Sequence, residues 1–148
     1  MQGDLATAII LAAEAHDGQV DKNGQPYILH PLRVMLAQDG NEERIAAVLH
    51  DVVEDTDLIG LGDILAIFGE EIREAVDSVT RREGEDYFDY VVRAKANPIG
   101  RQVKIADLND NMDRGRAPAI DPDRRARMAK YDHALAFLLD KTIVKEAA

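Results

Sequence analysis

The chain has 148 residues, 46% of them hydrophobic and 31% charged, and its formal net charge is −10 at pH 7. This length fits one domain with a single core, and the acidic balance argues against nucleic acid as a partner because phosphate backbones bind to positively charged surfaces. Cysteine is absent, so disulfides and thiolate metal sites are excluded, and any metal ion must be held by nitrogen and oxygen atoms. The short apolar runs and the non-basic N-terminus predict a cytoplasmic protein without a membrane segment or a signal peptide.

Helical periodicity begins near the N-terminus. Apolar residues recur at helical spacing from Asp4, a suitable N-cap, to Ala15. A polar loop that contains glycine and proline follows over residues 17–26. Pro31 suits the first turn of a second helix, which places His30 at the start of that helix.

The rest of the chain is also predicted to be helical. Further helices are expected from Asn41 into the stretch 49–56, and over about residues 61–68, 70–79, 86–96, 99–112 and 121–143. Gly69 is expected as a hinge, and a break is expected at residues 114–118. The side chains expected to face inward from the helix at 86–96 are Tyr87, Phe88, Val91 and Val92. Because no strand alternation or repeat is found, the sequence predicts an all-α single domain over residues 1–148. It should have about seven or eight helices, a core of about residues 5–115 and a C-terminal helix at about 121–143.

The stretch from Leu49 to Thr56 concentrates groups that could bind a metal ion. It contains one imidazole and three carboxylates: His50, Asp51, Glu54 and Asp55. On a helix, Glu54 lies four residues after His50 and three after Asp51, so these side chains share a face. Crowded carboxylates repel one another, and a divalent cation such as Mn²⁺, Zn²⁺ or Fe²⁺ would compensate them. A solvated acidic end of a helix is the alternative interpretation.

Two residues outside this stretch are candidate ligands as well. His30 supplies a second imidazole at the start of its predicted helix. Asp107 interrupts an otherwise apolar part of its helix, where a carboxylate is costly unless it is paired or bound to a metal ion. A structural salt bridge from Asp107 to Lys104 or Arg101 is the alternative interpretation.

The candidate ligands occur in the order His…His-Asp…Asp, which resembles the signature of the HD superfamily of metal-dependent phosphohydrolases. Within that superfamily, five blocks follow the order found in the hydrolase domain of RelA/SpoT-type alarmone enzymes. These blocks are residues 15–19, 24–31, 49–56, 68–69 and 103–107. The resemblance covers about residues 5–115. Because no synthetase domain follows, the chain resembles a stand-alone small alarmone hydrolase with an HD-type helical bundle.

The resemblance implies a reaction and a set of site residues. The reaction is removal of the 3′-pyrophosphate from ppGpp or pppGpp, which releases GDP or GTP. One Mn²⁺ would be bound by His30, His50, Asp51 and Asp107. The residues that position and deprotonate the attacking water would be Glu54 and Asp55. The residues expected to bind the nucleotide or its phosphates are Lys22, Asn23, Tyr27, Lys104 and Asn111. A single ion is expected because no histidine lies between Asp51 and Asp107, the interval from which dinuclear HD proteins draw extra histidines.

The sequence also departs from the family pattern. Asp21 stands where the family commonly has an arginine, and an aspartate cannot stack on a purine as a guanidinium can. Leu108 replaces the arginine that usually follows the last ligand, and Arg114 replaces a small hydroxyl residue. The alternatives are therefore a phosphatase that acts on another nucleotide, such as the 2′-phosphate of NADPH or a ppApp-like nucleotide, and a non-catalytic nucleotide-binding module. The sequence leaves the oligomeric state open, with a homodimer as one option.

Three further residues, His16, Arg81 and Arg82, have both a structural and a functional interpretation, and His133 has a structural one alone. His16 is either a structural histidine or a partner that orients a ligand. His133 is expected on the surface or in the core of the last helix. The pair Arg81 and Arg82 is either a solvated charged loop or a contact for phosphate.

Overall fold

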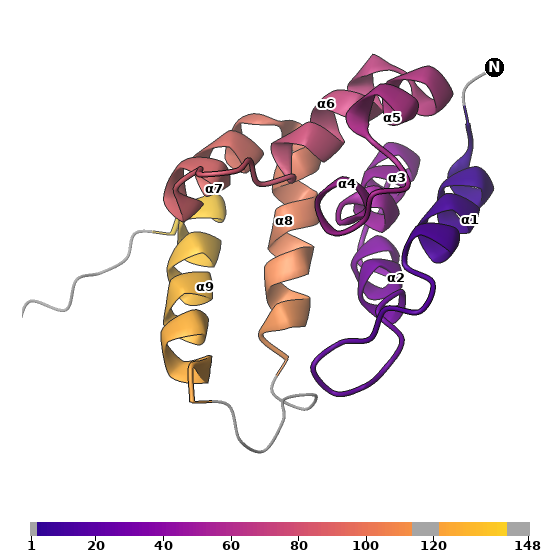
Figure 1. Ribbon diagram of the computed structural model, residues 1–148. Coiled ribbons are helices and arrows are strands. Elements are labelled where there is room, and N and C mark those ends of the chain that lie inside the picture. Colours follow the sequence, from indigo (N-terminus) through magenta and orange to yellow (C-terminus); the bar gives the residue numbers. More distant parts are fainter. Residues whose placement is uncertain (1–2, 114–121, 142–148) are drawn as a thin grey trace, which may run out of the picture.

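The computed structural model describes residues 3–113 and 122–141, and these residues form nine helices (Figure 1). The helices are α1 (Leu5–Ala15), α2 (Leu29–Leu36), α3 (Asn41–Leu49), α4 (Val52–Asp55), α5 (Leu61–Phe68), α6 (Glu70–Ser78), α7 (Tyr87–Ala96), α8 (Pro98–Asn111) and α9 (Arg124–Leu138). In the described part of the chain the only β-pairing is an isolated bridge between Val20 and Pro26. The expected all-α fold is therefore confirmed, with eight helices of at least eight residues and the single-turn α4.

The helix ends carry the chemistry that the sequence led us to expect. The Asp4 side chain caps α1 by accepting a hydrogen bond from the Thr7 backbone N–H at 2.9 Å. Gly69 separates α5 from α6 with a φ of 91°, a left-handed conformation that favours glycine. The expected break at residues 114–118, and the parts of the last helix at 121 and 142–143, lie outside the described residues.

Two expectations about the helices were wrong. Val92 is 47% exposed, whereas Tyr90 is buried and donates a hydrogen bond to the Val79 carbonyl at 2.8 Å. The inner face of α7 therefore follows Tyr90, Val91 and Ala94, and Val92 lies on the outer face. In addition, the acidic stretch is not one helix, because α3 ends at Leu49, a turn covers residues 50–51, and α4 begins at Val52.

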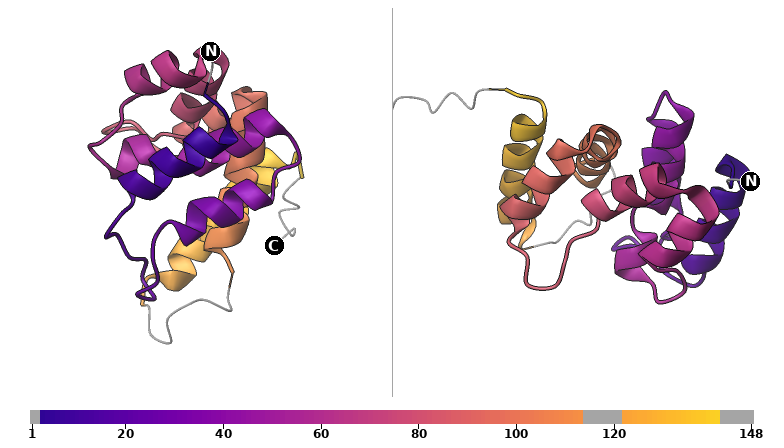
Figure 2. Two further views of the ribbon diagram at one scale, coloured as in Figure 1. Left: turned by 90° about the vertical axis from the view of Figure 1, so that its right-hand side faces the viewer. Right: turned by 90° about the horizontal axis from the view of Figure 1, so that it is seen from above.

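Helix α3 lies at the centre of the main core. Its residues Ile45 to Leu49 are all buried, and it packs against α1, α2, α6 and α8. A second, smaller core cluster joins α7, α8 and α9 through Val91, Leu108, Ala134 and Leu138. The second view in Figure 2 shows α7 and α9 on one side of α8 and the earlier helices on the other. Helix α8 is therefore the element shared by both parts of the molecule.

Helix α8 lies close to α6 because its first turn contains a glycine. A Cβ atom on Gly100 would collide with the Ser78 hydroxyl at the end of α6. The Asn97 side chain caps α8 by accepting hydrogen bonds from the Ile99 and Gly100 backbone N–H groups. These contacts fix the position of α8, which carries Asp107. In the described part of the chain, no helix is both long and apolar enough to span a membrane.

Candidate functional site

Three segments that are far apart in the sequence meet at one buried point. The start of α2 brings His30, the end of α3 brings His50, and the middle of α8 brings Asp107. All three side chains are buried, and each offers a ligand atom that lies within 4.8 Å of the other two. Asp107 Oδ1 is 2.9 Å from His30 Nε2 and 3.3 Å from His50 Nε2.

The fourth predicted ligand, Asp51, joins this group because the helix is interrupted. On a regular helix, adjacent side chains point about 100° apart. The turn between α3 and α4 instead brings Asp51 Oδ2 to 3.1 Å from His50 Nε2 and 3.5 Å from His30 Nε2. The structure therefore brings together all four residues that the sequence proposed as ligands.

Each histidine is held through its other ring nitrogen. His50 Nδ1 lies 2.6 Å from the Ala47 carbonyl oxygen, an acceptor that requires the proton to sit on Nδ1. His30 Nδ1 lies 2.6 Å from Asp110 Oδ2, and Arg33 holds the Asp110 carboxylate with two further hydrogen bonds. Both Nε2 atoms are thus directed at the carboxylates. Hydrogen bonds to the second ring nitrogen are a regular feature of histidines that bind metal ions.

Asp110 is a site residue that the sequence analysis missed. It lies three residues after Asp107 and therefore on the same face of α8, which is the signal that could have identified it. Burial raises the pKa of the Asp110 carboxyl, but its hydrogen bonds with His30 and Arg33 outweigh this effect and lower the pKa to about 2. Asp110 is therefore charged when it orients His30.

The carboxylates around His30 and His50 favour positive charge at this point, as the raised pKa values of both imidazoles show. Burial lowers the pKa of His30, but hydrogen bonds with Asp107 and Asp110 outweigh burial and raise it to about 9. Burial likewise opposes protonation of His50, and Asp51 and Asp107 raise its pKa well above the ordinary value. Without a metal ion, protons on the imidazoles compensate the carboxylates. Two oriented imidazoles and two carboxylates are a donor set that fits a divalent ion such as Mn²⁺, Fe²⁺ or Zn²⁺.

The second oxygen of Asp107 makes the salt bridge that was considered as an alternative. The buried Lys104 donates a hydrogen bond from Nζ to Asp107 Oδ2 at 2.8 Å. Arg101 bonds elsewhere, to the Leu138 carbonyl and to Asp140. The salt bridge and the contact with the histidines thus coexist on the two oxygens of one carboxylate. In the structure the Lys104 ammonium group binds Asp107, and its contact with phosphate stays a prediction.

The carboxylates of α4 lie beside the ligand cluster. Single oxygens of Asp51, Glu54 and Asp55 lie within 4.8 Å of one another. Tyr27 donates its hydroxyl proton to Asp51 Oδ2 at 2.6 Å and contacts Asp55 Oδ2 at 3.3 Å, while Glu54 Oε1 accepts a hydrogen bond from the Arg81 backbone N–H at 2.6 Å. Burial raises the pKa of both Glu54 and Asp55, and the charge of Asp51 raises them further.

This arrangement can be compared with known proteins. Residues 8–108 match the family model described as the HD domain. The chain belongs to the HD domain family. The resemblance to RelA/SpoT-type enzymes is also confirmed, because the chain is 33% identical to the Vibrio cholerae protein named guanosine-3′,5′-bis(diphosphate) 3′-pyrophosphohydrolase, over 85% of this chain and 20% of that protein. It is 33% identical to the Escherichia coli bifunctional (p)ppGpp synthase/hydrolase SpoT over the same shares of the two chains.

These relatives are much longer than the chain, which spans about a fifth of their length. A solved structure, described as a metazoan ortholog of SpoT that hydrolyses ppGpp, matches with a TM-score of 0.74 and 24% identity. The match covers 91% of this chain and 84% of that one. This likeness establishes that the HD domain has the same fold in both proteins.

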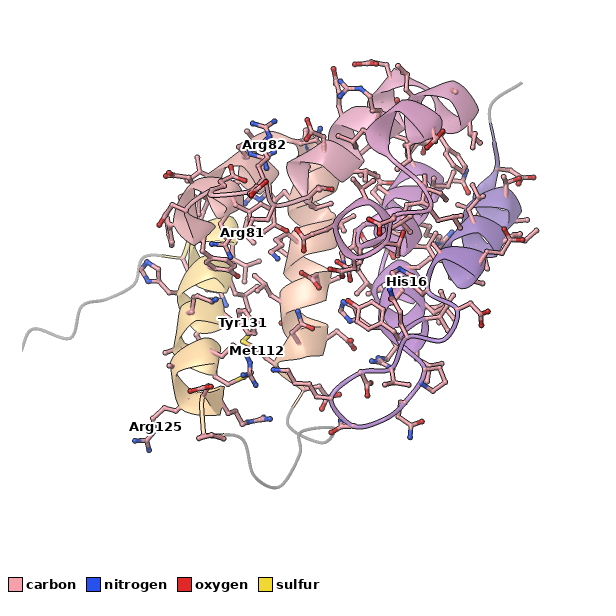
Figure 3. All side chains as sticks on the ribbon, in the orientation of Figure 1. His16, Arg81, Arg82, Met112, Arg125 and Tyr131 are labelled. Carbon is pink, nitrogen blue, oxygen red and sulfur yellow. The ribbon has the colours of Figure 1, made fainter. Side chains whose placement is uncertain are left out.

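A cavity of about 330 Å³ opens beside His30 of the HD domain. Four of the five residues predicted to bind substrate line it: Lys22, Asn23, Tyr27 and Asn111. The fifth, Lys104, does not line it. Helix α9 supplies another part of the wall, with Arg124, Arg127, Met128 and Tyr131, and no sequence motif had pointed to these residues. In Figure 3, Tyr131 and Met112 lie between α9 and α8.

The loop from residue 17 to residue 26 forms the opposite wall of this cavity. Asp21, which stands in place of the family's arginine, accepts hydrogen bonds from the Asn23 and Gln25 backbone N–H groups at 2.8 and 3.0 Å. It therefore shapes the turn that carries Lys22 and Asn23. Aspartate is well suited to this role because its short side chain can accept hydrogen bonds from backbone groups two residues further on.

His16 supports Asp55 of the HD domain indirectly. The buried His16 ring lies with Nδ1 2.8 Å from Gln19 Oε1, and Gln19 Nε2 donates to the Asp55 carbonyl at 3.0 Å. His16 is thus linked through Gln19 to the backbone of Asp55, and its hydrogen bond is to Gln19 rather than to a predicted ligand. The other histidine outside the cluster, His133, is exposed on α9 and packs its ring against Phe88.

Replacing Asp110 by alanine is expected to weaken metal binding by about 10- to 100-fold, because His30 loses the carboxylate that orients its ring. The measurement is a titration of the metal-free protein with Mn²⁺ by calorimetry. Asn109→Ala, an exposed change on the same helix, is the matched control and should keep the affinity of the original chain. An unchanged affinity in Asp110→Ala would show that packing alone orients His30.

Proposed function

We propose that this HD domain is a Mn²⁺-dependent hydrolase that removes the 3′-pyrophosphate from (p)ppGpp-like nucleotides. The products would be GDP or GTP and pyrophosphate. The observation that carries the proposal is the position of the His30, His50, Asp51 and Asp107 cluster between two carboxylates on α4 and a cavity large enough for part of a nucleotide. The relatives are named as a guanosine-3′,5′-bis(diphosphate) 3′-pyrophosphohydrolase and as a (p)ppGpp synthase/hydrolase, and these names support the choice of substrate.

In this proposal the four clustered residues hold the ion. A bound divalent ion lowers the pKa of a water molecule and offsets negative charge on a phosphate group. The carboxylates of Glu54 and Asp55 are the groups that accept the proton of the attacking water. Their pKa values are raised, and a general base works best when its pKa is close to the working pH. Tyr27 and the Arg81 backbone N–H hold these carboxylates in position.

The bonds change as follows in the proposed reaction. The water oxygen joins the phosphorus atom that is attached to the ribose 3′-oxygen, and the bond between that phosphorus and the 3′-oxygen breaks. The 3′-oxygen leaves as a hydroxyl after it takes up a proton, and pyrophosphate is released. The nucleoside part occupies the cavity, where Arg127 and Tyr131 offer a guanidinium plane and an aromatic ring to a base.

One observation favours a different nucleotide. Because Asp21 belongs to the turn of the loop, this position offers no guanidinium to the base. A phosphatase that acts on the 2′-phosphate of NADPH, or a hydrolase of ppApp-like nucleotides, is therefore the second candidate. Both would use the same ion and the same carboxylates.

The test is a hydrolysis assay with Mn²⁺ in which ppGpp, ppApp and NADPH are compared and the products are separated. The proposal predicts that pyrophosphate is released from ppGpp. Activity on ppApp alone, or orthophosphate released from NADPH alone, would support the second candidate. If the protein binds Mn²⁺ but hydrolyses none of the three, the proposed substrate class is wrong.

A further inference from the structure

Three cations lie around the ring of Tyr87, whose centroid is 6.4 Å from that of Tyr131 in the wall of the cavity. Lys130 Nζ on α9 lies 4.3 Å from the centre of the ring, the Arg81 guanidinium carbon lies 5.5 Å from it, and Lys104 Nζ on α8 lies 5.9 Å from it. Lys104 is buried, whereas Arg81 and Lys130 are exposed. The two exposed cations are therefore accessible to a ligand.

No carboxylate compensates the two exposed cations within the described residues. Arg81 Nε donates to a backbone carbonyl, that of Glu85, at 3.1 Å, and neither Arg81 nor Lys130 forms an ion pair with a described carboxylate. Burial lowers the pKa of Lys130, and the positive charges of Arg81, Lys104 and Arg127 lower it further. Uncompensated positive charge is unexpected on a chain whose net charge is −10. It indicates a place where an anion would be stabilised.

Tyr87 itself adds a hydrogen-bond donor without an acceptor. Its hydroxyl oxygen is buried and has no hydrogen-bond partner among the described residues. Burial raises the pKa of this hydroxyl, so the group keeps its proton at neutral pH. A buried donor without an acceptor is costly, and an oxyanion that reaches it would remove that cost.

The cations lie next to both parts of the proposed active site, the metal and carboxylate residues and the cavity. The Arg81 backbone N–H holds Glu54, and Lys104 holds Asp107. On α9, Arg127 and Tyr131 line the nucleotide cavity, whereas Lys130 contacts the Tyr87 ring. In Figure 3, Arg81 and Tyr131 lie along the same side of α9, which faces α8. Lys104, which contacts both Asp107 and the Tyr87 ring, therefore links these cations to the proposed metal ligands.

We propose that Arg81 and Lys130 form a subsite for the outer phosphate of the 3′-pyrophosphate. This inference deepens the proposed function and rests on it. The outer phosphate carries more charge than a bridging group, and the two cations stabilise it both in the bound nucleotide and in the departing pyrophosphate. The subsite makes the enzyme selective for a pyrophosphorylated 3′-position over a monophosphorylated one.

The test compares the double variant Arg81→Gln/Lys130→Gln with the matched control Arg82→Gln/Arg125→Gln, which removes the same charge. Both control residues are exposed, and in Figure 3 they point away from the space between α8 and α9. Inorganic pyrophosphate and orthophosphate are each titrated into the Mn²⁺-loaded proteins by calorimetry. The double variant should bind pyrophosphate about 10-fold more weakly, because it loses charge-assisted hydrogen bonds, and should bind orthophosphate nearly unchanged. The control should bind both anions as the original chain does.

A kinetic measurement complements the titration. The ratio of kcat/KM for ppGpp to kcat/KM for guanosine 5′-diphosphate 3′-monophosphate should fall about 10-fold in the double variant and stay constant in the control. Pyrophosphate affinity that is equal in the double variant and the original chain would overturn the subsite, as would equal weakening of pyrophosphate and orthophosphate. If the original chain hydrolyses no pyrophosphorylated nucleotide but the double variant still loses pyrophosphate binding, the proposed function fails and the subsite stands. Circular dichroism of all three proteins checks that they are folded.

Discussion

Replacing Asp51 by alanine is expected to abolish stoichiometric metal binding and to lower kcat/KM on the order of 10³-fold or more. Asp51 Oδ2 lies within 3.5 Å of the Nε2 atoms of His30 and His50 and also accepts a hydrogen bond from the Tyr27 hydroxyl. Its loss therefore removes a proposed ligand and frees Tyr27, which also contacts Asp55. The remaining three residues would leave the ion with fewer oxygen ligands than a hard divalent cation prefers.

The measurement for Asp51→Ala is the metal content of the protein after gel filtration, together with its hydrolysis rate. Asp57→Ala is the matched control because Asp57 is an exposed carboxylate in the same acidic region and follows α4. The control should keep one equivalent of metal and full activity. If Asp51→Ala retains one equivalent of metal, Asp51 is not a ligand and the proposed coordination is wrong.

Glu54→Gln is expected to keep the metal ion and to lower kcat by about 10²- to 10⁴-fold. A glutamine oxygen can still accept the hydrogen bond from the Arg81 backbone N–H, so the position of the side chain is preserved. The amide cannot take a proton from water, however, and the step that depends on a base is lost. KM should change little, since Glu54 does not line the nucleotide cavity.

Metal content and steady-state kinetics together test Glu54→Gln. Glu83→Gln, an exposed change in the loop before α7, serves as the control and should leave both quantities unchanged. Full activity in Glu54→Gln would assign the base to Asp55. Loss of the metal ion in Glu54→Gln would show that Glu54 helps to bind it.

Sequence periodicity was sufficient for most of the fold because each long helix carries its own apolar face and local end signals. Asp4, Gly69 and the Asn97-Pro98 pair mark helix ends by chemistry that acts over a few residues. Val92 was placed wrongly because Tyr87, Phe88, Val91 and Val92 are all apolar or aromatic, so that periodicity alone leaves the rotation of the helix ambiguous. In the structure, Tyr90, Val91 and Ala94 face inward, and the Tyr90 hydroxyl donates a hydrogen bond to the Val79 carbonyl.

The candidate ligands were predictable because metal sites restrict residue types and order more strongly than packing does. Other parts of the site depend on contacts between residues far apart in the chain. His30 and Asp110 are separated by 80 positions, and their hydrogen bond could not be read from a local pattern. The same holds for Arg127 and Tyr131, which reach the cavity only because α9 packs against α7 and α8. The turn at residues 50–51 was also missed, since an apolar run followed by acidic residues is typical of a continuous helix.

The division of the apolar interior into two clusters leads us to expect separate local openings for release of the proposed ion and of the proposed nucleotide. The proposed metal ligands belong to segments that contribute to the main core, whereas α9 is held mainly by the small cluster it shares with α7 and α8 and by the ion pairs of Asp140. Local opening of a segment requires only the contacts of that segment to break. Detachment of α9 would therefore remove one wall of the nucleotide cavity and leave His30, His50, Asp51 and Asp107 in place. In the proposed function, we therefore expect product exchange to follow the opening of α9 rather than the exchange of the ion.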